Sequence, residues 1–293
     1  MSAAKHVVVG LGEVLWDVFP DGPRFGGAPA NYACHAASLG ADSHMVSGVG
    51  RDDLGERALH ALRRHGVETS AIRQGRYPTG AVHIQLDDEG KASYEFLDNT
   101  AWDHLEWSQE LEELAVRTDA VCFGTLGQRS RESQQTIRRF VNATSATCLR
   151  IFDINLRPPF HADDMILESL KIANILKLND DELPIVATLC GLAGTEREIM
   201  QSLTQRFGLQ LVALTRGAHG ALLVHGEQVS DHPGVATSVI DTVGAGDSFT
   251  ATLTLGLLAG LDLEAINDQA CRVAAFVCSQ AGATPQLPPE LPG

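Results

Sequence analysis

Two glycines and a carboxylate precede a long apolar run near the C-terminal end of the chain. The segment is Gly244-Ala245-Gly246-Asp247, and the apolar run extends over residues 249–261. The first N–H groups of a helix have no partner within the helix, the helix dipole attracts anions to that end, and glycines let a phosphate come close to the main chain. We therefore expect a phosphate-binding helix start, with Asp247 facing the group that attacks the phosphate. The alternative is that Asp247 only caps a helix that follows a glycine-rich turn.

A second carboxylate lies in an apolar segment near the N-terminus. Alternation over residues 13–20 places Glu13 and Asp17 on one face and Val14, Trp16 and Val18 on the other. A carboxylate in so apolar a strand needs a polar partner, and the paired hydroxyls of a sugar could donate to it. The alternative is an edge strand whose Asp17 points into water.

A glycine pair follows directly. In Phe25-Gly26-Gly27-Ala28-Pro29-Ala30-Asn31 the glycines, which lack Cβ atoms, would let a ligand lie against the backbone. Asn31, one turn into the helix that starts near Pro29, could point its amide at that ligand. A plain turn before the helix explains the glycines equally well, but not Asn31.

Polar residues also follow three apolar strand candidates. Asp153, Asn155 and Arg157 alternate at the end of one strand, where ligands of open α/β sheets collect, although ordinary loop polarity before Pro158 is the alternative. Residues 179–182 read first as a helix-capping pattern, with Asn179 as the cap and Glu182 three residues later. The loop from Thr215 to Gly220, between two apolar strands, could be a simple hairpin turn.

Short apolar runs alternate with longer amphipathic ones, which is typical of β-α units around a mostly parallel sheet. The chain is therefore predicted to be an α/β protein. The strand candidates are residues 6–9, 44–46, 120–123, 149–154, 175–178, 211–214 and 221–224, and the helix candidates include 29–39, 54–65, 130–142, 195–207, 248–258 and 263–280.

One region breaks this alternation. Residues 79–86 and 91–97 are period-2 segments joined by Asp87-Asp88-Glu89-Gly90, which predicts a hairpin whose Val82, Ile84 and Leu86 share one face. With the extended segments 13–19 and 24–25, the hairpin could form a small sheet that projects from the main domain. An ordinary edge hairpin is the alternative.

Composition excludes several classes of protein. The chain has 293 residues, 44% of them hydrophobic, and a formal net charge of −15, which argues against a nucleic-acid surface. No apolar run reaches the roughly 18 residues of a membrane span. The six cysteines show no metal-ligand spacing, so we expect a reduced, cytoplasmic protein. Residues 10–15 lack the third glycine of a dinucleotide fingerprint, and the sequence contains no P-loop.

Five segments, in order, resemble the motifs of ribokinase-like sugar kinases of the phosphofructokinase-B type. They are the acidic strand at Asp17, Gly26-Gly27 with Asn31, the Asp153-x-Asn155-x-Arg157 pattern with Asn179-x-x-Glu182, the Thr215-Arg216-Gly217-x-x-Gly220 loop, and residues 241–247. The resemblance spans the whole chain. It implies a single domain over residues 1–293 with a three-layer α/β fold and a mostly parallel central sheet. It also implies a small β-sheet lid made of segments about 13–26 and 79–100.

The resemblance further implies transfer of the ATP γ-phosphoryl group to a primary hydroxyl of a sugar. Asp247 would be the general base, and the N–H groups of residues 244–247 together with Mg²⁺ would stabilise the transferred charge. The implied sites are listed by role: sugar, Asp17, Gly26, Gly27, Asn31, Phe96 and Arg157; nucleotide, Asn179, Thr215, Arg216, Gly217, Gly220 and Gly246; Mg²⁺ through water, Asn179 and Glu182; and K⁺ through carbonyls, Asp241, Val243, Gln280 and Gly282.

Within that family the segments 12–20, 26–31 and 99–103 look most like fructokinases, although Asn99-Thr100 departs from the expected Glu-Asn. Fructose is therefore the expected sugar. A 2-keto-3-deoxygluconate kinase would need cationic partners for the substrate carboxylate, and Arg157 is one candidate. A catalytically silent sugar-binding protein is the other alternative, which the intact Asp247 disfavours. A lid-to-lid homodimer is expected, because the apolar face of the hairpin needs a cover.

Overall fold

The computed structural model describes residues 5–86, 92–288, 290 and 291. The predicted hairpin turn at residues 87–90 lies outside this range. In the described part of the chain, no helix is both long and apolar enough to cross a membrane.

A nine-stranded sheet forms the centre of the molecule, in the order β13-β12-β11-β10-β9-β8-β1-β4-β5. All neighbours from β5 to β11 are parallel, and β12 and β13 are added antiparallel at one edge. The strands are β1 Val7–Leu11, β4 Asp42–Gly50, β5 Ile72–Gly75, β8 Ala120–Phe123, β9 Leu149–Asp153, β10 Ile175–Asn179, β11 Leu211–Thr215, β12 Ala221–His225 and β13 Gln228–His232.

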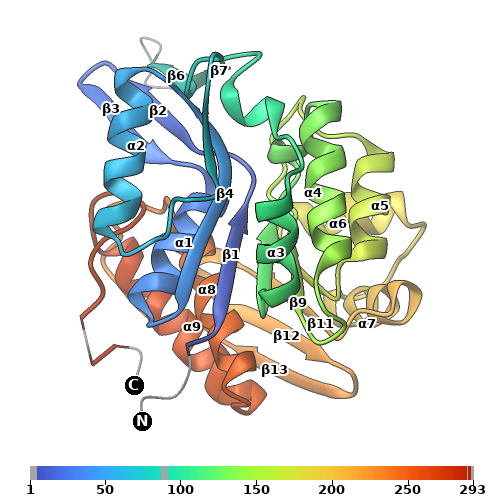
Figure 1. The fold of residues 1–293 in the computed structure, drawn as a ribbon. Helices are drawn as coiled ribbons and strands as arrows, with labels where there is room; N and C mark the ends of the chain where they lie inside the picture. The colour runs from blue at the N-terminus through green and yellow to red at the C-terminus, as the bar shows by residue number, and fades with distance from the viewer. Residues whose placement is uncertain (1–4, 87–91, 289, 292–293) are drawn as a thin grey trace.

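Helices cover both faces of this sheet, which completes the three layers (Figure 1). One apolar cluster joins the sheet to α3–α7, and another joins its opposite face to α1, α8 and α9. The helices are α1 Ala28–Ser38, α2 Asp53–Arg64, α3 Gln109–Arg117, α4 Arg131–Ala143, α5 Asp163–Ile172, α6 Glu182–Leu189, α7 Glu196–Phe207, α8 Ala245–Leu258 and α9 Leu263–Cys278. The predicted mostly parallel α/β architecture is confirmed.

Local sequence signals account for many of the element ends. α7 begins after a capping box made by Thr195 and Glu198 and ends at Gly208, which is left-handed with φ 65°. The prediction omitted α3, α5, α6, β5 and β13. β13 is polar and lies at the sheet edge, so it carries no apolar alternation, and the short α6 has Pro184 in its first turn, which hides its helical pattern.

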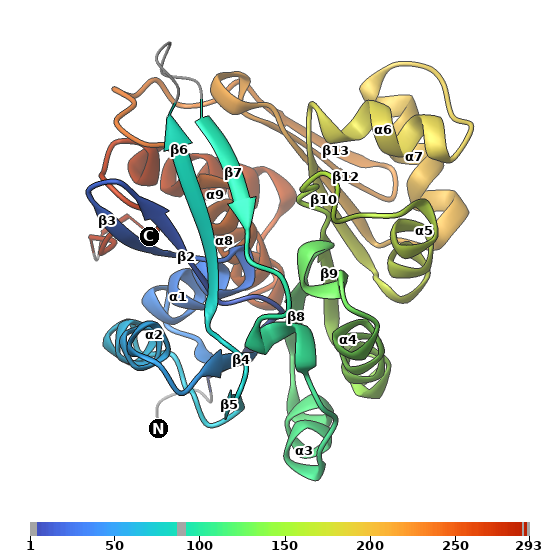
Figure 2. The same cartoon turned by 90° about the horizontal axis from the view of Figure 1, so that it is seen from above.

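A second sheet of four strands forms the lid, in the order β3-β2-β6-β7. Its strands are β2 Leu15–Phe19, β3 Gly22–Gly26, β6 Gly80–Leu86 and β7 Ala92–Phe96. The hairpins β2-β3 and β6-β7 join through a parallel pairing of β2 with β6, which confirms the predicted small sheet. Seen from above, β6 and β7 cross the molecule in front of α1 and α8 (Figure 2).

Each face of the lid has contacts within the chain. Trp16 donates from its indole to the carbonyl of Leu54 on α2, with an N–O distance of 2.9 Å. On the other face, Val82 and Ile84 are buried in a cluster with Leu15. This face also carries Tyr94, which pairs with Ile84 and is 63% exposed, and it lines the large cleft described below. The predicted dimer therefore stays a prediction.

Candidate active site

A cleft of about 1370 Å³ lies between the lid and the carboxyl ends of the parallel strands. The lid contributes Asp17, Gly26 and Phe96, and the segment that leads into α1 contributes Gly27. Among the predicted site residues, the cleft is also lined by Asn31, Arg157, Asn179, Thr215, Gly217, Gly220, Val243, Gly244, Ala245, Gly246 and Asp247. The fold thus brings together segments that are more than two hundred residues apart in the sequence.

The start of α8 forms one wall of the cleft. Gly244 precedes the helix in the left-handed region, with φ 80°, and a Cβ atom there would stand 2.1 Å from the carbonyl oxygen of Ala283. Only glycine fits this position. Asp247 is the third residue of the helix rather than its cap, so the alternative in which Asp247 is a cap is wrong. The N–H groups of Gly246 and Asp247 belong to the first turn, where a helix makes no internal bonds to them.

The environment of Asp247 suits a general base. Its Oδ2 accepts a hydrogen bond from Nδ2 of Asn31 at 2.9 Å. Burial and repulsion by Asp153 raise the pKa of Asp247 to about 6, against the opposing effects of Asn31, Lys177 and Arg157. The carboxylate is therefore ionised at neutral pH and is more basic than an ordinary aspartate.

Lys177 is a site residue that the sequence analysis missed. Its Nζ is 3.1 Å from Oδ1 of Asp153, and a Cβ atom on Gly246 would stand 3.0 Å from the same Nζ. Burial lowers the pKa of Lys177, but the carboxylates of Asp153, Glu182 and Asp247 outweigh this effect and raise it. Lys177 is thus a buried cation beside the first turn of α8. A signal was present, because a lysine inside an apolar strand needs an anionic partner.

The three polar residues at the end of β9 and in the loop after it do not all line the cleft. Asn155 and Arg157 line the cleft, whereas Asp153 does not. Asp153 lies below it, paired with Lys177, and its Oδ2 accepts a hydrogen bond from Oγ1 of Thr250 at 3.0 Å. Asp153, the last residue of its strand, is thus bonded to β10 and α8 and faces only a small chamber beside the cleft. Its predicted contact with a ligand stays a prediction.

Asn179 and Glu182 bond to each other as a capping pair. Glu182 donates its N–H to Oδ1 of Asn179, and Asn179 donates its N–H to Oε2 of Glu182, both at 2.9 Å. The other Glu182 oxygen accepts the N–H of Leu156 at 2.8 Å. The reciprocal hydrogen bonds expected of a capping pair are present, but the predicted positions are wrong, because the helix cap is Asp181 and Glu182 is the first residue of α6. Asn179 lines the cleft, and Glu182 lies behind it and holds the loop after β9.

The loop between β11 and β12 forms another part of the wall. Thr215, Gly217 and Gly220 line the cleft, and the segment is the predicted connection between two antiparallel strands. Arg216 does not line it. Its guanidinium forms ion pairs with Asp231 and Glu196, so the position predicted to supply a counter-charge to phosphate is already occupied by chain carboxylates.

Apolar residues beyond this loop also escaped the sequence analysis. They lie in the irregular segment before α8, which shows no periodicity, and on the inner face of α9. They are Val235, Val239, Cys271, Ala274 and Cys278. Together they provide an apolar wall in this part of the cleft.

The two segments predicted to supply K⁺ ligands lie side by side. Asp241 accepts the N–H of Val243 at Oδ1, at 3.0 Å, and the N–H of Gly282 at Oδ2, at 3.1 Å. Gln280 belongs to the same loop as Gly282 and donates its own N–H to Val277. The carboxylate of Asp241 therefore ties the turn before α8 to the loop after α9.

Known proteins share this fold and sequence over almost the whole chain. Residues 21–290 match the model of the pfkB family carbohydrate kinases. The chain is 31% identical over 267 residues to the sugar kinase PH1459 of Pyrococcus horikoshii, an alignment that covers 88% of this chain and 82% of that protein. It is 28% identical over 317 residues to a fructokinase of Escherichia coli, covering 98% and 97% of the two chains.

Solved structures agree. The crystal structure of PH1459 in complex with ATP has a TM-score of 0.81 and 29% identity, and the match covers 95% of this chain and 94% of that one. The 2-dehydro-3-deoxygluconokinase of Thermotoga maritima has a TM-score of 0.84 with 19% identity, over 96% of each chain, which is a likeness of fold. The chain therefore belongs to the PfkB family of carbohydrate kinases, with a ribokinase-like fold, and is an ATP-dependent sugar kinase.

Proposed function

We propose that this kinase transfers the γ-phosphoryl group of ATP to a primary hydroxyl of a neutral sugar, and that fructose is its preferred substrate. The observation that carries the proposal is the position of Asp247. It stands at the start of α8, between a hydroxyl-binding wall and a wall suited to a nucleotide. The fructokinase of Escherichia coli is a full-length relative.

The sugar would lie under the lid. Asp17 and Asn31 offer oxygen and nitrogen atoms to hydroxyls, and Gly26 and Gly27 leave the backbone open to a compact ring. Phe96 lines the cleft from β7 and packs edge-on against Phe160, with ring centroids 5.0 Å apart. It could cover an apolar face of the ring.

In the reaction, Asp247 would accept the proton of the attacking hydroxyl, while Asn31 holds its carboxylate in place. The N–H groups of Gly246 and Asp247 would face the charge on the transferring group, and Lys177 adds a fixed positive charge beside Gly246. The nucleotide would lie along Thr215, Gly217 and the apolar wall.

The residues suit a Mg²⁺ ion that reaches the protein through water. Asn179 and Asp180 line the cleft. Oδ1 of Asn179 and both Glu182 oxygens accept backbone N–H groups. Bound with ATP, Mg²⁺ would neutralise phosphate charge. Asn179 would hold its water shell, and Glu182 would fix the position of Asn179.

The cations of the cleft favour a neutral sugar over an acid sugar. Among the described residues that line it, the only arginine and lysine are Arg157 and Lys177. Lys177 is committed to Asp153 and to the phosphate end of the site. A substrate carboxylate would have Arg157 alone and would face Asp17, an arrangement that costs several kcal/mol in a closed site.

The test is a comparison of kcat/KM for fructose, ribose and 2-keto-3-deoxygluconate on one preparation, with ADP release as the readout. Fructose should be the best by at least about tenfold, which corresponds to about 1.4 kcal/mol of transition-state binding. A 2-keto-3-deoxygluconate preference would replace the proposal with the acid-sugar kinase.

We also propose a homodimer that assembles through the lid and a cytoplasmic location, both by analogy with the family. Tyr94 pairs with Ile84 on the same face of the lid and is 63% exposed, so a dimer would use the open part of this face. Light scattering at micromolar concentration should give twice the chain mass of 31.3 kDa, and a monomer mass would refute the dimer.

A further inference from the structure

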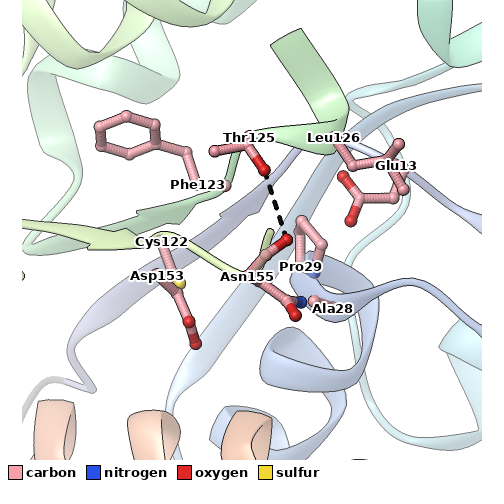
Figure 3. Close-up of a pocket in the computed structure, with 10 residues that line it drawn as sticks. Glu13, Ala28, Pro29, Cys122, Phe123, Thr125, Leu126, Asp153 and Asn155 are labelled. Atoms are coloured by element: carbon pink, nitrogen blue, oxygen red, sulfur yellow. Dashed lines mark hydrogen bonds between the residues drawn. The ribbon is translucent and has the colours of Figure 1, made fainter. Parts of the chain in front are cut away.

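Glu13 is a buried carboxylate that the proposed mechanism does not use. It lies two residues after β1, is 3% exposed, and lines the cleft. It also lines an adjoining small chamber of about 10 Å³ together with Thr125, Asp153 and Asn155, and Asn155 lines the cleft as well. Figure 3 shows its carboxylate turned toward the interior of this chamber.

One oxygen of Glu13 has no partner. The N–H groups of Glu13 and of Ala28, at the start of α1, stabilise the charged form of the carboxyl group. In the described part of the chain, however, Oε2 is buried without a hydrogen bond. A buried polar atom left in this way costs about 1–3 kcal/mol, so such atoms usually have a ligand or a water to satisfy them.

A second buried acceptor lies beside the same wall. Asn31 donates to Asp247 through Nδ2, but its Oδ1 is also buried and has no partner among the described residues. Glu13, Asn31 and Asp17 all line the cleft, and all offer oxygen atoms. A ligand that satisfies this wall must bring several hydrogen-bond donors and no negative charge.

The chamber limits the size of the group that Glu13 can bind. A volume near 10 Å³ holds about one water-sized group. We propose that Glu13 and this chamber form the subsite for one hydroxyl of the sugar, which makes Glu13 a specificity-determining residue. The inference rests on the proposed function and adds a third oxygen-bearing contact, besides Asp17 and Asn31.

A hydroxyl suits this position in either protonation state of Glu13. Burial and the nearby Asp247 raise the pKa of Glu13 to about 7, while Arg157 and the two N–H groups lower it. The ionised carboxylate can accept from a hydroxyl, and the protonated one can donate to it. A substrate carboxylate could pair only with the protonated form, so the subsite also selects against acid sugars.

The test is a double-mutant cycle in which one change is made in the protein, at Glu13, and the other is the removal of one hydroxyl from the substrate. Wild type, Glu13→Gln and Glu13→Ala are assayed with fructose, or with the best neutral sugar, and with each of its monodeoxy analogues. Wild type should lose at least about tenfold in kcat/KM when one particular hydroxyl is removed. In Glu13→Ala that loss should shrink below about threefold, while the losses for the other hydroxyls stay unchanged.

The control is Thr136→Val, which removes a buried hydroxyl that bonds to Leu105 outside the cleft. It should keep the wild-type pattern of losses. Stabilisation of each variant by sugar alone, measured as a rise in Tm, provides a readout that needs no turnover.

Equal losses in wild type and Glu13→Ala for every deoxysugar, in both kcat/KM and Tm, would overturn the inference and leave the chamber to a structural water. That result leaves the proposed function intact. A wild type that phosphorylates no neutral sugar would instead refute the proposed function.

Discussion

Two buried ion pairs in the described part of the chain are equally hidden from solvent and differ in what surrounds them. Arg129 and Asp103 are 7% and 5% exposed, and Lys177 and Asp153 are 8% and 6% exposed. The Arg129 pair is bidentate, with N–O distances of 2.8 and 2.7 Å, and the guanidinium stacks on Trp102 at 4.1 Å. The Lys177 pair rests on a single contact of 3.1 Å.

The difference separates a structural pair from a functional one. Arg129 also donates to the carbonyl of Leu97, just after β7, at 2.6 Å, so it ties the end of the lid to the loop before α4. Lys177 lies against Gly246 and lines the cleft. An ammonium group has three donors, so Lys177 can bind Asp153 and still offer a donor to a phosphate.

The largest effect on activity is expected at Asp247, whose carboxylate lies close to both Lys177 and Asp153. Asp247→Asn keeps the shape and the hydrogen bond from Asn31 but removes the base, which supplies on the order of 10²–10⁴ in rate. kcat should fall by that factor while sugar binding survives. A loss of less than about tenfold would mean that Asp247 is not the base.

The same variant should not be less stable at pH 7. The folded state raises the pKa of Asp247, so the stability linked to this group is full below about pH 4 and is lost as pH rises through about 6. The amide introduced by Asp247→Asn cannot ionise and avoids this loss. A thermal melt at pH 7 should therefore show a Tm equal to or above that of wild type.

Arg129→Leu should chiefly affect stability. It leaves Asp103 buried without its cation, and removal of one partner of a buried pair costs about 3–5 kcal/mol. The urea midpoint should fall accordingly, while kcat of the remaining folded protein stays within about threefold of wild type. Asp103→Asn combined with Arg129→Leu should recover part of the stability. A loss of kcat as large as that of Asp247→Asn would erase the distinction between the two pairs.

Lys177→Met should reduce both stability and turnover. Asp153 loses its cation, and the first turn of α8 loses a positive charge at the point where phosphate charge develops. We expect kcat to fall by about 10²-fold, in the range seen when one charge-stabilising donor is removed. Adding Asp153→Asn should recover stability but not kcat. Recovery of kcat in the double variant would show that Lys177 only neutralises Asp153.

The contrast between these pairs also explains what the sequence could and could not predict. Asp247, Gly244 and Gly246 form a contiguous motif, and Asp17 and Asn31 lie in short distinctive segments, so their neighbourhood in the cleft was predictable. The alternation of strands and helices is also a local pattern, so it predicted the parallel sheet. Local patterns of this kind survive folding unchanged.

Other features depend on which segments the fold brings together. Asp153 and Arg216 looked free in the sequence, but they are paired with Lys177 on β10 and with Asp231 on β13. The parallel pairing of β2 with β6, which covers Val82, joins hairpins about sixty residues apart. Side-chain partners across such distances leave no periodic trace in one sequence.

The pH dependence provides a finer test of the comparison. With a pKa of about 6, Asp247 becomes protonated, and so inactive as a base, below that pH. kcat/KM should fall about tenfold per pH unit there, whereas an ordinary aspartate would keep its activity down to about pH 4. Because Lys177 lowers the pKa of Asp247, Lys177→Met should move this limb to higher pH. Arg129→Leu should leave the acidic limb of the pH profile unchanged. A shift of this limb in Arg129→Leu would contradict the structural role assigned to the Arg129 pair.

The smallest expected effect concerns a third acidic position, one whose described hydrogen-bond partners are backbone N–H groups rather than a lysine or arginine. Asp241 bonds to the N–H groups of Val243 and Gly282. The resemblance to ribokinase-like kinases implies that carbonyl oxygens of these two segments hold K⁺, and Asp241 ties the segments together next to the start of α8. We predict that K⁺ raises kcat several-fold over Na⁺ by fixing the turn that carries Gly244.

The measurement is the rate in KCl and in NaCl at matched ionic strength, with Asp241→Asn as the variant. That variant keeps an acceptor for one N–H group but removes the negative charge, so it should weaken the response to K⁺ without abolishing the basal rate. Equal rates in both salts for wild type would remove the cation from the mechanism and leave Asp241 as a purely internal tie between the two loops.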